Sequence, residues 1–294
     1  MRKVIIVGCG YVGKRVAALW RMRDALVYAT ARHSKSLEEL RSLGIEALHV
    51  DLDDPKSLAA LDIEHCLLYY FAPPAASGQL DGRMRVFLDI LGATRIPQKI
   101  VYISTTGVYG DRHGAWVTED SPVDPQTPRA RRRLDAENIL RAWGRQHAAA
   151  VVILRVPGIY GPGRLPVDAI RSHRPVVQQS ECGFSNRIHV DDLAQICVAA
   201  ADYGPGDAIY NASDGSPGTM TDYFNAVADA LGLQRPPVIS RAEAAQILSA
   251  EMLSYLSESR RIDNRRMLDE LGVTLRYPDL ETGLRASIKE ESTA

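Results

Sequence analysis

The stretch Lys3-Val-Ile-Ile-Val-Gly8-Cys-Gly10-Tyr-Val-Gly13 decides the fold. Four apolar residues form a strand pattern, three glycines follow, and a helical pattern then runs over Tyr11–Met22. This order begins a βαβ unit, in which the glycines allow a tight turn, a close backbone approach to a pyrophosphate, and helix packing on the strand. The helix start also presents unpaired N–H groups to phosphates. The stretch therefore predicts a dinucleotide site made by Gly8, Gly10, Tyr11, Val12 and Gly13.

Short β-branched runs alternate with helical patterns through the first half of the chain, which is typical of parallel strands joined by crossover helices. The expected strands are Val4–Val7, Ala25–Ala31, Glu46–Val50, Cys66–Phe71, Lys99–Ser104 and Val151–Val156. The expected helices are Tyr11–Met22, Ser36–Leu43, Gln79–Thr94 and Arg129–His147, with a short turn near Pro55–Leu61. Nearly nonpolar strands indicate a sheet covered on both faces. The fold class is therefore α/β, a doubly wound parallel (Rossmann) sheet.

After about Gly158 the pattern loosens into loops and short elements. We expect a helix over Asp191–Ala201, a strand over Ala208–Asn211, and helices over Met220–Leu231, Arg241–Leu256, Asp263–Leu271 and Pro278–Ile288. The sequence thus predicts two domains. Residues 1–157 and 187–215 would form the dinucleotide-binding domain, and residues 158–186 and 216–294 a smaller, mostly helical C-terminal domain that carries the substrate cleft.

Composition excludes several classes of partner. The 294 residues include 35 basic and 36 acidic side chains, a net charge of −1, so no global field attracts nucleic acid or an anionic membrane. No apolar run reaches membrane-spanning length, and the apolar segment near the N-terminus is too short for a signal peptide, so we expect a cytoplasmic protein. The four cysteines and seven histidines lack metal-ligand spacing. No metal site is expected.

The residues after the second expected strand bear on which cofactor is bound. This segment reads Ala29-Thr-Ala-Arg32-His-Ser-Lys35 and holds no carboxylate for a free ribose hydroxyl. Arg32 can make a planar two-point contact with a phosphate, which favours NADP over NAD, although Arg32 can also simply solvate the strand end. Further cofactor contacts are expected after the third strand, from Asp51 and Leu52, and after the fourth, from Phe71, Ala72 and Pro73.

Three later segments carry a family resemblance. They are Tyr102-Ile-Ser-Thr-Thr-Gly-Val-Tyr109-Gly110, Leu154-Arg-Val-Pro157-Gly-Ile-Tyr160-Gly-Pro162 and Arg187-Ile-His-Val-Asp191-Asp-Leu-Ala194. With them the chain resembles the extended branch of the short-chain dehydrogenase/reductases, the group of nucleotide-sugar epimerases and dehydratases. The glycine turn departs from the usual G-x-x-G-x-x-G, because Val7 fills its first place. The resemblance implies a nicotinamide cofactor, with Pro157 in the cofactor site.

The resemblance also implies a catalytic arrangement that this chain carries only in part. A strand-end hydroxyl that orients the substrate corresponds to Thr105. The tyrosine that transfers a proton, and the lysine four residues later that lowers its pKa, are replaced by Arg129 and Arg133. Arginine does not exchange protons near neutral pH. Arg133 is therefore expected at the nicotinamide ribose, and the acid–base group is left unidentified.

Two further departures concern the substrate. Thr106-Gly107 replace the acid pair of the dehydratases, and Gly158 replaces an asparagine that holds sugar nucleotides. Arg129 and Arg133 share a helix face, whereas Arg131 and Arg132 are expected to turn away.

Several side chains are candidates for the substrate cleft. Arg129 and Arg187 suit an anionic ligand, although the helix start also fits a plain solvated basic face. Tyr109 and Tyr160 are expected to line the cleft, whereas His189 is expected to be a packed strand-end residue rather than a catalytic one.

Two hypotheses follow. The first is an NADP-dependent oxidoreductase or epimerase-like enzyme for a small polar substrate, of an anionic or nucleotide-sugar-like kind, positioned by Thr105. The second is a catalytically degenerate NADP-binding sensor or scaffold that kept the cofactor fold. The resemblance further implies a homodimer through the helices expected at Gln79–Thr94 and Arg129–His147.

Overall fold

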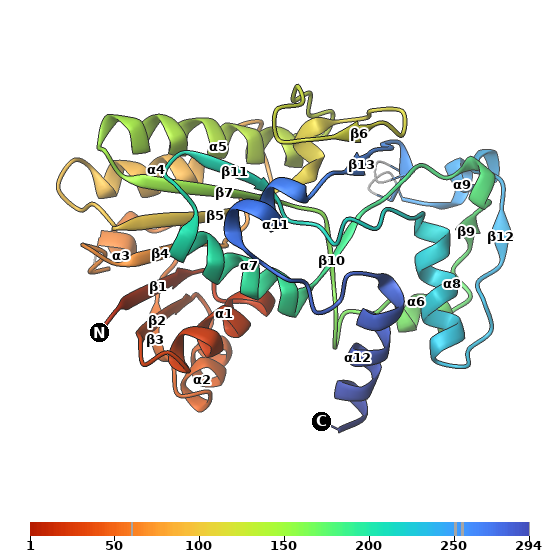
Figure 1. Cartoon of the computed structure of the whole chain (residues 1–294), viewed down its shortest axis with the longest axis horizontal. Coiled ribbons are helices and arrows are strands. Elements are labelled where there is room, and N and C mark those ends of the chain that lie inside the picture. The colour runs from red at the N-terminus through yellow and green to blue at the C-terminus, as the bar shows by residue number, and fades with distance from the viewer. Residues whose placement is uncertain (60, 250–251, 254–255, 294) are drawn as a thin grey trace.

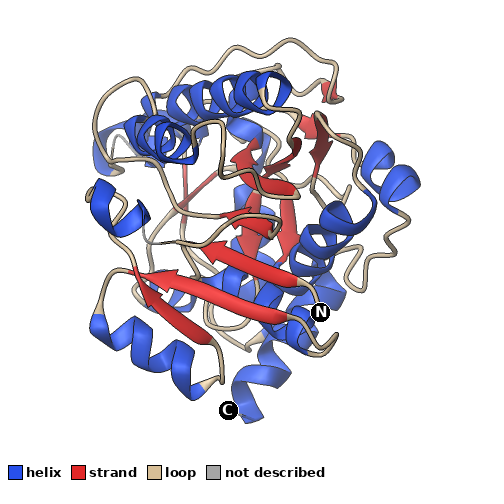
Figure 2. Ribbon diagram, turned by 90° about the vertical axis from the view of Figure 1, so that its left-hand side faces the viewer, coloured by secondary structure: helices blue, strands red, loops and turns tan. Residues whose placement is uncertain are grey.

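The computed structural model describes the chain except residues 60, 250–251, 254–255 and 294. Its centre is a seven-stranded sheet in the order β11-β7-β5-β4-β1-β2-β3, with every neighbouring pair parallel. The strands are β1 (Lys3–Val7), β2 (Leu26–Ala31), β3 (Glu46–His49), β4 (Leu67–Tyr70), β5 (Lys99–Thr105), β7 (Ala150–Val156) and β11 (Ala208–Asn211). Figure 2 shows the strands between two layers of helices.

Each face of the sheet is covered by its own set of helices (Figure 1). One core cluster includes residues of α1 (Tyr11–Arg21), α2 (Ser34–Ser42), α7 (Val190–Tyr203) and α11 (Arg265–Leu271). The other includes residues of α3 (Pro55–Ala59), α4 (Gly82–Leu91) and α5 (Pro128–Gln146). Strand β1 is consequently buried on both sides, with Val4 and Ile5 at most 1% exposed. The predicted doubly wound α/β fold is confirmed.

Some element boundaries differ from the sequence prediction for local reasons. Helix α4 begins at Gly82 because the Asp81 carboxylate caps it, accepting a hydrogen bond from Met84 N at 3.1 Å. The helix predicted over Arg241–Leu256 ends at Ile247 in α9 (Arg241–Ile247), because Leu248 is extended. Part of that prediction, residues 250–251 and 254–255, lies outside the described residues.

The C-terminal half builds a further apolar cluster. Helices α6 (Val167–Arg171), α8 (Met220–Ala230) and α12 (Leu280–Thr293) contribute buried residues such as Ile170, Val227 and Leu284. Small parallel pairs join distant segments: β8 (Gly158–Tyr160) with β10 (Arg187–His189), β9 (Val176–Val177) with β12 (Val238–Ile239), and β6 (Trp116–Val117) with β13 (Arg261–Ile262). Two 3₁₀ helices, η1 (Thr106–Tyr109) and η2 (Gln179–Glu181), complete the elements used below.

The β8–β10 pair crosses the boundary that the sequence predicts at residue 187. The pair therefore joins the start of the predicted C-terminal domain, at β8, to β10, which leads directly into α7. The two-domain division itself stays a prediction. None of the helices that the structure describes is both long and apolar enough to span a bilayer.

Candidate functional site

The glycine turn between β1 and α1 has three different local environments. Gly8 has a φ of +84°, and a Cβ there would lie 2.6 Å from Ala72 N. A Cβ on Gly13 would lie 3.1 Å from Cys9 Sγ, so this glycine lets α1 pack closely. A Cβ on Gly10 would meet nothing within 4 Å. The turn is therefore tight at its start, packed at its end, and open in the middle, where a pyrophosphate would approach.

The start of α1 fits an anion. Among the described residues no side chain caps this helix at Gly10, and its first turn contains no acid. The N–H groups of the first turn, which includes Tyr11 and Val12, thus have no carboxylate competing for them. The Tyr11 hydroxyl donates to Pro162 O at 2.8 Å, and the Arg164 guanidinium lies 4.2 Å from the Tyr11 ring. These contacts tie the turn to the loop after β8. The residues present therefore fit a dinucleotide.

The wall expected beside the cofactor lies against this turn. Phe71 N and Ala72 N, which follow β4, both donate to Val7 O at the end of β1, at 2.9 and 3.2 Å. Pro73 and Pro157 both line the neighbouring cleft. The structure thus brings these predicted cofactor residues to one edge of the sheet.

Arg32 lies just past β2, with half of its side chain exposed. Its Nη1 is 4.0 Å from Asp53 Oδ2, but Arg83 holds that carboxylate through hydrogen bonds of 2.8 and 2.5 Å. These hydrogen bonds lower the pKa of Asp53. Asp51 and Leu52 follow β3, and Asp51 Oδ1 accepts from Asp53 N at 3.0 Å. The Arg32 guanidinium therefore lies near the end of the sheet, and the charge of its neighbour Asp53 is largely neutralised by Arg83.

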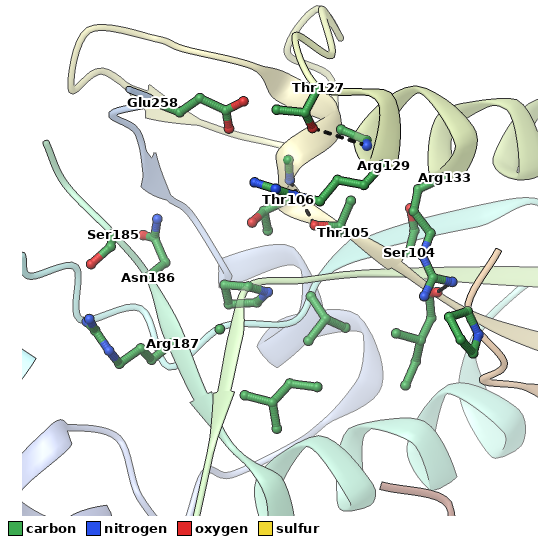
Figure 3. Close-up of a pocket in the computed structure, with 18 of the residues that line it drawn as sticks. Ser104, Thr105, Thr106, Thr127, Arg129, Arg133, Ser185, Asn186, Arg187 and Glu258 are labelled. Atoms are coloured by element: carbon green, nitrogen blue, oxygen red, sulfur yellow. Dashed lines mark hydrogen bonds between the residues drawn. The ribbon is translucent and has the colours of Figure 1, made fainter. Parts of the chain in front are cut away.

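A cavity of about 610 Å³ opens beyond the carboxyl ends of β5 and β7 (Figure 3). This cleft brings together seven residues that the sequence predicts for the site: Pro73, Thr105, Arg129, Arg133, Pro157, Tyr160 and Arg187. It is also lined by Asn186, Tyr223 and Glu258, which sequence reasoning missed, and by Arg260. Asn186 and Glu258 come from loops and Tyr223 from α8, and none of the three belongs to a motif. The family resemblance places residues 259–266 near the cleft, but their spacing does not show whether Arg260 reaches a ligand.

Thr105 ends β5 and caps η1. Its Oγ1 accepts a hydrogen bond from Gly107 N at 3.1 Å, drawn as a dashed line in Figure 3. The hydroxyl hydrogen of Thr105 is consequently directed away from that contact and can be donated to an oxygen of a bound molecule.

The arginines at the start of α5 lie where the helix spacing predicts, with one correction. Arg129 and Arg133 both line the cleft, and Arg133 Nη1 donates to Ile103 O at 2.9 Å and to the Tyr102 hydroxyl at 3.2 Å. Arg132 was expected to turn away, yet it also lines the cleft, and its Nη1 donates to Gly78 O at 2.7 Å. The loop before α4 folds over this helix end and draws the side chain in.

The expectation that Tyr109 lines the cleft is wrong. Tyr109 is fully buried, because η1 turns its side chain into the core. Its hydroxyl donates to Asn211 Oδ1 at 2.7 Å, and its ring faces the Arg155 guanidinium at 4.9 Å. Tyr160 does line the cleft, but its hydroxyl donates to Asp279 O at 3.4 Å, just before α12. Burial raises the pKa of Tyr160, which makes it a poor proton donor near neutral pH.

Arg187 is a buried cation in the cleft wall, 8% exposed. Its Nη2 donates to Thr219 O at 3.3 Å, and its guanidinium lies 4.3 Å from the Tyr223 ring. Burial lowers the pKa of Arg187 and raises that of the nearby Asp214 to about 7.

His189 is packed between elements as expected. Its Nδ1 accepts from Asp191 N at 3.2 Å, its Nε2 lies 3.2 Å from Ser287 Oγ, and burial lowers its pKa to about 4. Within the described part of the chain no group of histidines, cysteines and acids is arranged to hold a metal ion.

The model of the NAD dependent epimerase/dehydratase family matches residues 4–213, which run from β1 to just past β11 and include the glycine turn, Thr105 and Arg187. The chain belongs to this family. The match confirms the resemblance that the three later sequence segments carry.

Individual relatives extend the likeness over the whole chain. Protein YeeZ of Escherichia coli (strain K12) is 28% identical over 291 residues, covering 95% of this chain and 97% of YeeZ. The solved structure of a functionally unknown conserved protein from Silicibacter pomeroyi DSS has a TM-score of 0.85 and 29% identity, covering 99% of this chain and 100% of that one. The UDP-glucose 4-epimerase of Thermus thermophilus, solved in complex with NAD, shares the fold with a TM-score of 0.79 and 19% identity over 99% of both chains.

Proposed function

We propose that this protein is an NADP(H)-dependent oxidoreductase or epimerase-like enzyme that acts on an anionic nucleotide sugar. The observation that carries the proposal is the cleft itself: Thr105, Arg129 and Arg187 line one cavity, which lies at the same sheet edge as a turn that fits a dinucleotide. Ligands of open parallel sheets bind at this edge. A bound nicotinamide would give or take the hydride, and the chain would hold, orient and shield the two reactants.

Charge supports an anionic substrate. The cleft is lined by five arginines, namely Arg129, Arg132, Arg133, Arg187 and Arg260, and among the described lining residues Glu258 is the acid. Guanidinium groups match phosphates in shape and charge. Membership of a family that includes epimerases and dehydratases, together with the fold shared with the UDP-glucose 4-epimerase named above, adds support for the nucleotide-sugar class.

Thr105→Val is expected to lower kcat by about 100-fold on a nucleotide sugar that the wild type turns over, because the substrate oxygen loses the donor that orients it. Thr105→Ser, which keeps the hydroxyl, is expected to stay within about tenfold of the wild type. Because Thr105 also caps η1, thermal unfolding must show that both variants are folded. Equal kcat values for Thr105→Val and the wild type would remove Thr105 from the mechanism.

The preference for NADP over NAD rests on Arg32, which lies beyond β2 with a half-exposed guanidinium. We expect the wild type to bind NADPH at least tenfold more tightly than NADH, measured by quenching of protein fluorescence. Arg32→Glu is expected to reverse that ratio, because a carboxylate repels the 2′-phosphate and accepts from a ribose hydroxyl. Arg41→Glu, the same charge change on an exposed position of α2, serves as the control. An unchanged ratio in Arg32→Glu would refute the NADP assignment.

A further inference from the structure

A carboxylate lies beside Arg32, although none follows β2 directly in the sequence. Strands β2 and β3 are parallel neighbours in which Ala31 pairs with His49, and Val50 N donates to Ala31 O at 3.1 Å. The loop after β3 therefore runs alongside the end of β2, and it brings Asp53 Oδ2 to 4.0 Å from Arg32 Nη1. Dinucleotide-binding folds use an acid in this region to bind the ribose hydroxyl of NAD. A free Asp53 would consequently oppose a preference for NADP.

Arg83 holds this carboxylate at two points. Its Nε donates to Asp53 Oδ1 at 2.8 Å and its Nη2 to Asp53 Oδ2 at 2.5 Å, which is the forked geometry in which arginine pairs most strongly with a carboxylate. These hydrogen bonds keep the pKa of Asp53 below its usual range, so the carboxylate is ionised when it pairs with Arg83. Arg32, at 4.0 Å, is the more distant partner. The charge of Asp53 is thus directed toward Arg83 and away from Arg32.

The start of α4 fixes the position of Arg83. Arg83 is the second residue of this helix, which the Asp81 carboxylate caps. Its Nη1 donates to Pro73 O at 3.3 Å, in the segment that follows β4. The side chain of Arg83 is 20% exposed, whereas those of Arg32 and Asp53 are about half exposed. Arg83 is therefore the anchored member of the three, while the Arg32 guanidinium is accessible to a ligand.

We propose that Arg83 is a positioning residue that determines the cofactor preference: by pairing with Asp53, it leaves Arg32 available for the 2′-phosphate of NADP. Without Arg83, the Asp53 carboxylate would attract the Arg32 guanidinium, repel the 2′-phosphate and offer an acceptor to the ribose hydroxyl of NAD. Arg32 also contacts its neighbour His33, with 3.3 Å between Nη2 and the ring Nε2, a group that bears no negative charge. The inference rests on the NADP assignment proposed above. It adds that a second pair of residues maintains the selectivity without having to touch the cofactor.

Dissociation constants of NADPH and NADH, measured by quenching of protein fluorescence at low ionic strength, test this role. Arg83→Met is expected to lower the preference for NADPH about tenfold relative to the wild type, because it leaves an unpaired negative charge beside Arg32. The effect is expected to shrink at high salt, which screens charges that solvent reaches. Arg85→Met, which removes the partner of Asp135 on the same helix, is the matched control and is expected to leave the preference unchanged.

Variants of Asp53 separate this role from a direct contact between Arg83 and the cofactor. Asp53→Asn is expected to bind NADPH at least as tightly as the wild type. Removing the acid makes its partner dispensable, so the double variant Arg83→Met with Asp53→Asn is expected to recover the wild-type preference. A double variant that stays as poor as Arg83→Met would overturn the inference and assign Arg83 a direct contact with the cofactor. Thermal unfolding checks that each variant is folded, and Arg83→Gln replaces Arg83→Met if the latter is not.

The same titrations distinguish failure of this inference from failure of the cofactor assignment. A wild type that binds NADH more tightly than NADPH would overturn the NADP assignment, and the role of Arg83 with it. A wild type that prefers NADPH, together with an unchanged preference in Arg83→Met, would overturn the role of Arg83 alone and leave the cofactor assignment standing.

Discussion

Gly10→Ala is expected to weaken NADPH binding by about 100-fold while leaving the protein folded. A Cβ on Gly10 would meet no protein atom within 4 Å, so the fold tolerates the methyl group. The same methyl group would occupy the space through which the pyrophosphate approaches the backbone. The expected loss corresponds to about 2.7 kcal/mol of binding free energy. Titration of NADPH fluorescence gives the affinity, and thermal unfolding without cofactor gives the stability.

Gly8→Ala is the matched comparison. Its φ of +84° and the 2.6 Å approach of a Cβ to Ala72 N make this substitution damage the fold itself. We therefore expect Gly8→Ala to lower both the melting temperature and the affinity, whereas Gly10→Ala lowers the affinity alone. Normal NADPH binding by Gly10→Ala would show that the cofactor does not cross the turn at this position.

Arg155→Met is expected to reduce the free energy of unfolding by about 3–5 kcal/mol, the cost of leaving a buried charge unpaired. The side chains of Arg155 and Glu137 are 5% and 2% exposed, and Arg155 Nη2 lies 2.8 Å from Glu137 Oε2. Glu137 Oε1 also accepts from Ser104 Oγ at 2.5 Å, so the pair joins α5 to β5 and β7 beneath the cleft. Urea unfolding monitored by circular dichroism measures the change.

The double variant Arg155→Met with Glu137→Met separates the effect of the unpaired charge from the effect of altered side-chain packing. Replacing both members removes the unpaired charge, so the double variant is expected to be more stable than Arg155→Met alone. Independent, additive losses in the two single variants would show that the pair is not the energetic unit that its geometry indicates.

The sheet could be predicted from the sequence because its strands are both apolar and regularly interrupted. Burial of β1 on both faces leaves no polar alternation in Val4–Val7, and three glycines mark where the chain must turn. The two- and three-residue strands could not be predicted in this way, since β8 and β10 are too short to show a period.

Residues of the cleft could be predicted from the sequence only where they belong to a recognisable motif. Thr105 and Arg133 follow from the family pattern, and the structure places Thr105 at the end of β5 and the Arg133 guanidinium, which comes from α5, against Ile103 O of the same strand. The position of Tyr109 was mispredicted because the direction of a side chain in a 3₁₀ turn depends on the core beneath it. Glu258 was missed because it reaches the cleft through contacts with residues nearly 150 positions earlier, such as the hydrogen bond from Ser259 to Asp111.

The homodimer that the resemblance implies stays a prediction, as does a location in the cytoplasm. Neither affects the chemistry proposed for the cleft, whose described lining comes from one chain.

The proposed enzyme activity is tested most directly by hydride transfer in a single turnover. Protein saturated with NADP⁺ is mixed with a panel of UDP- and dTDP-hexoses, and the absorbance of reduced nicotinamide is followed. We expect at least one sugar nucleotide to produce the NADPH band, and the band to form far more slowly in Thr105→Val. Complete occupancy by NADP⁺ with no NADPH band for any sugar nucleotide would contradict this expectation and indicate a binding protein that has kept only the cofactor fold.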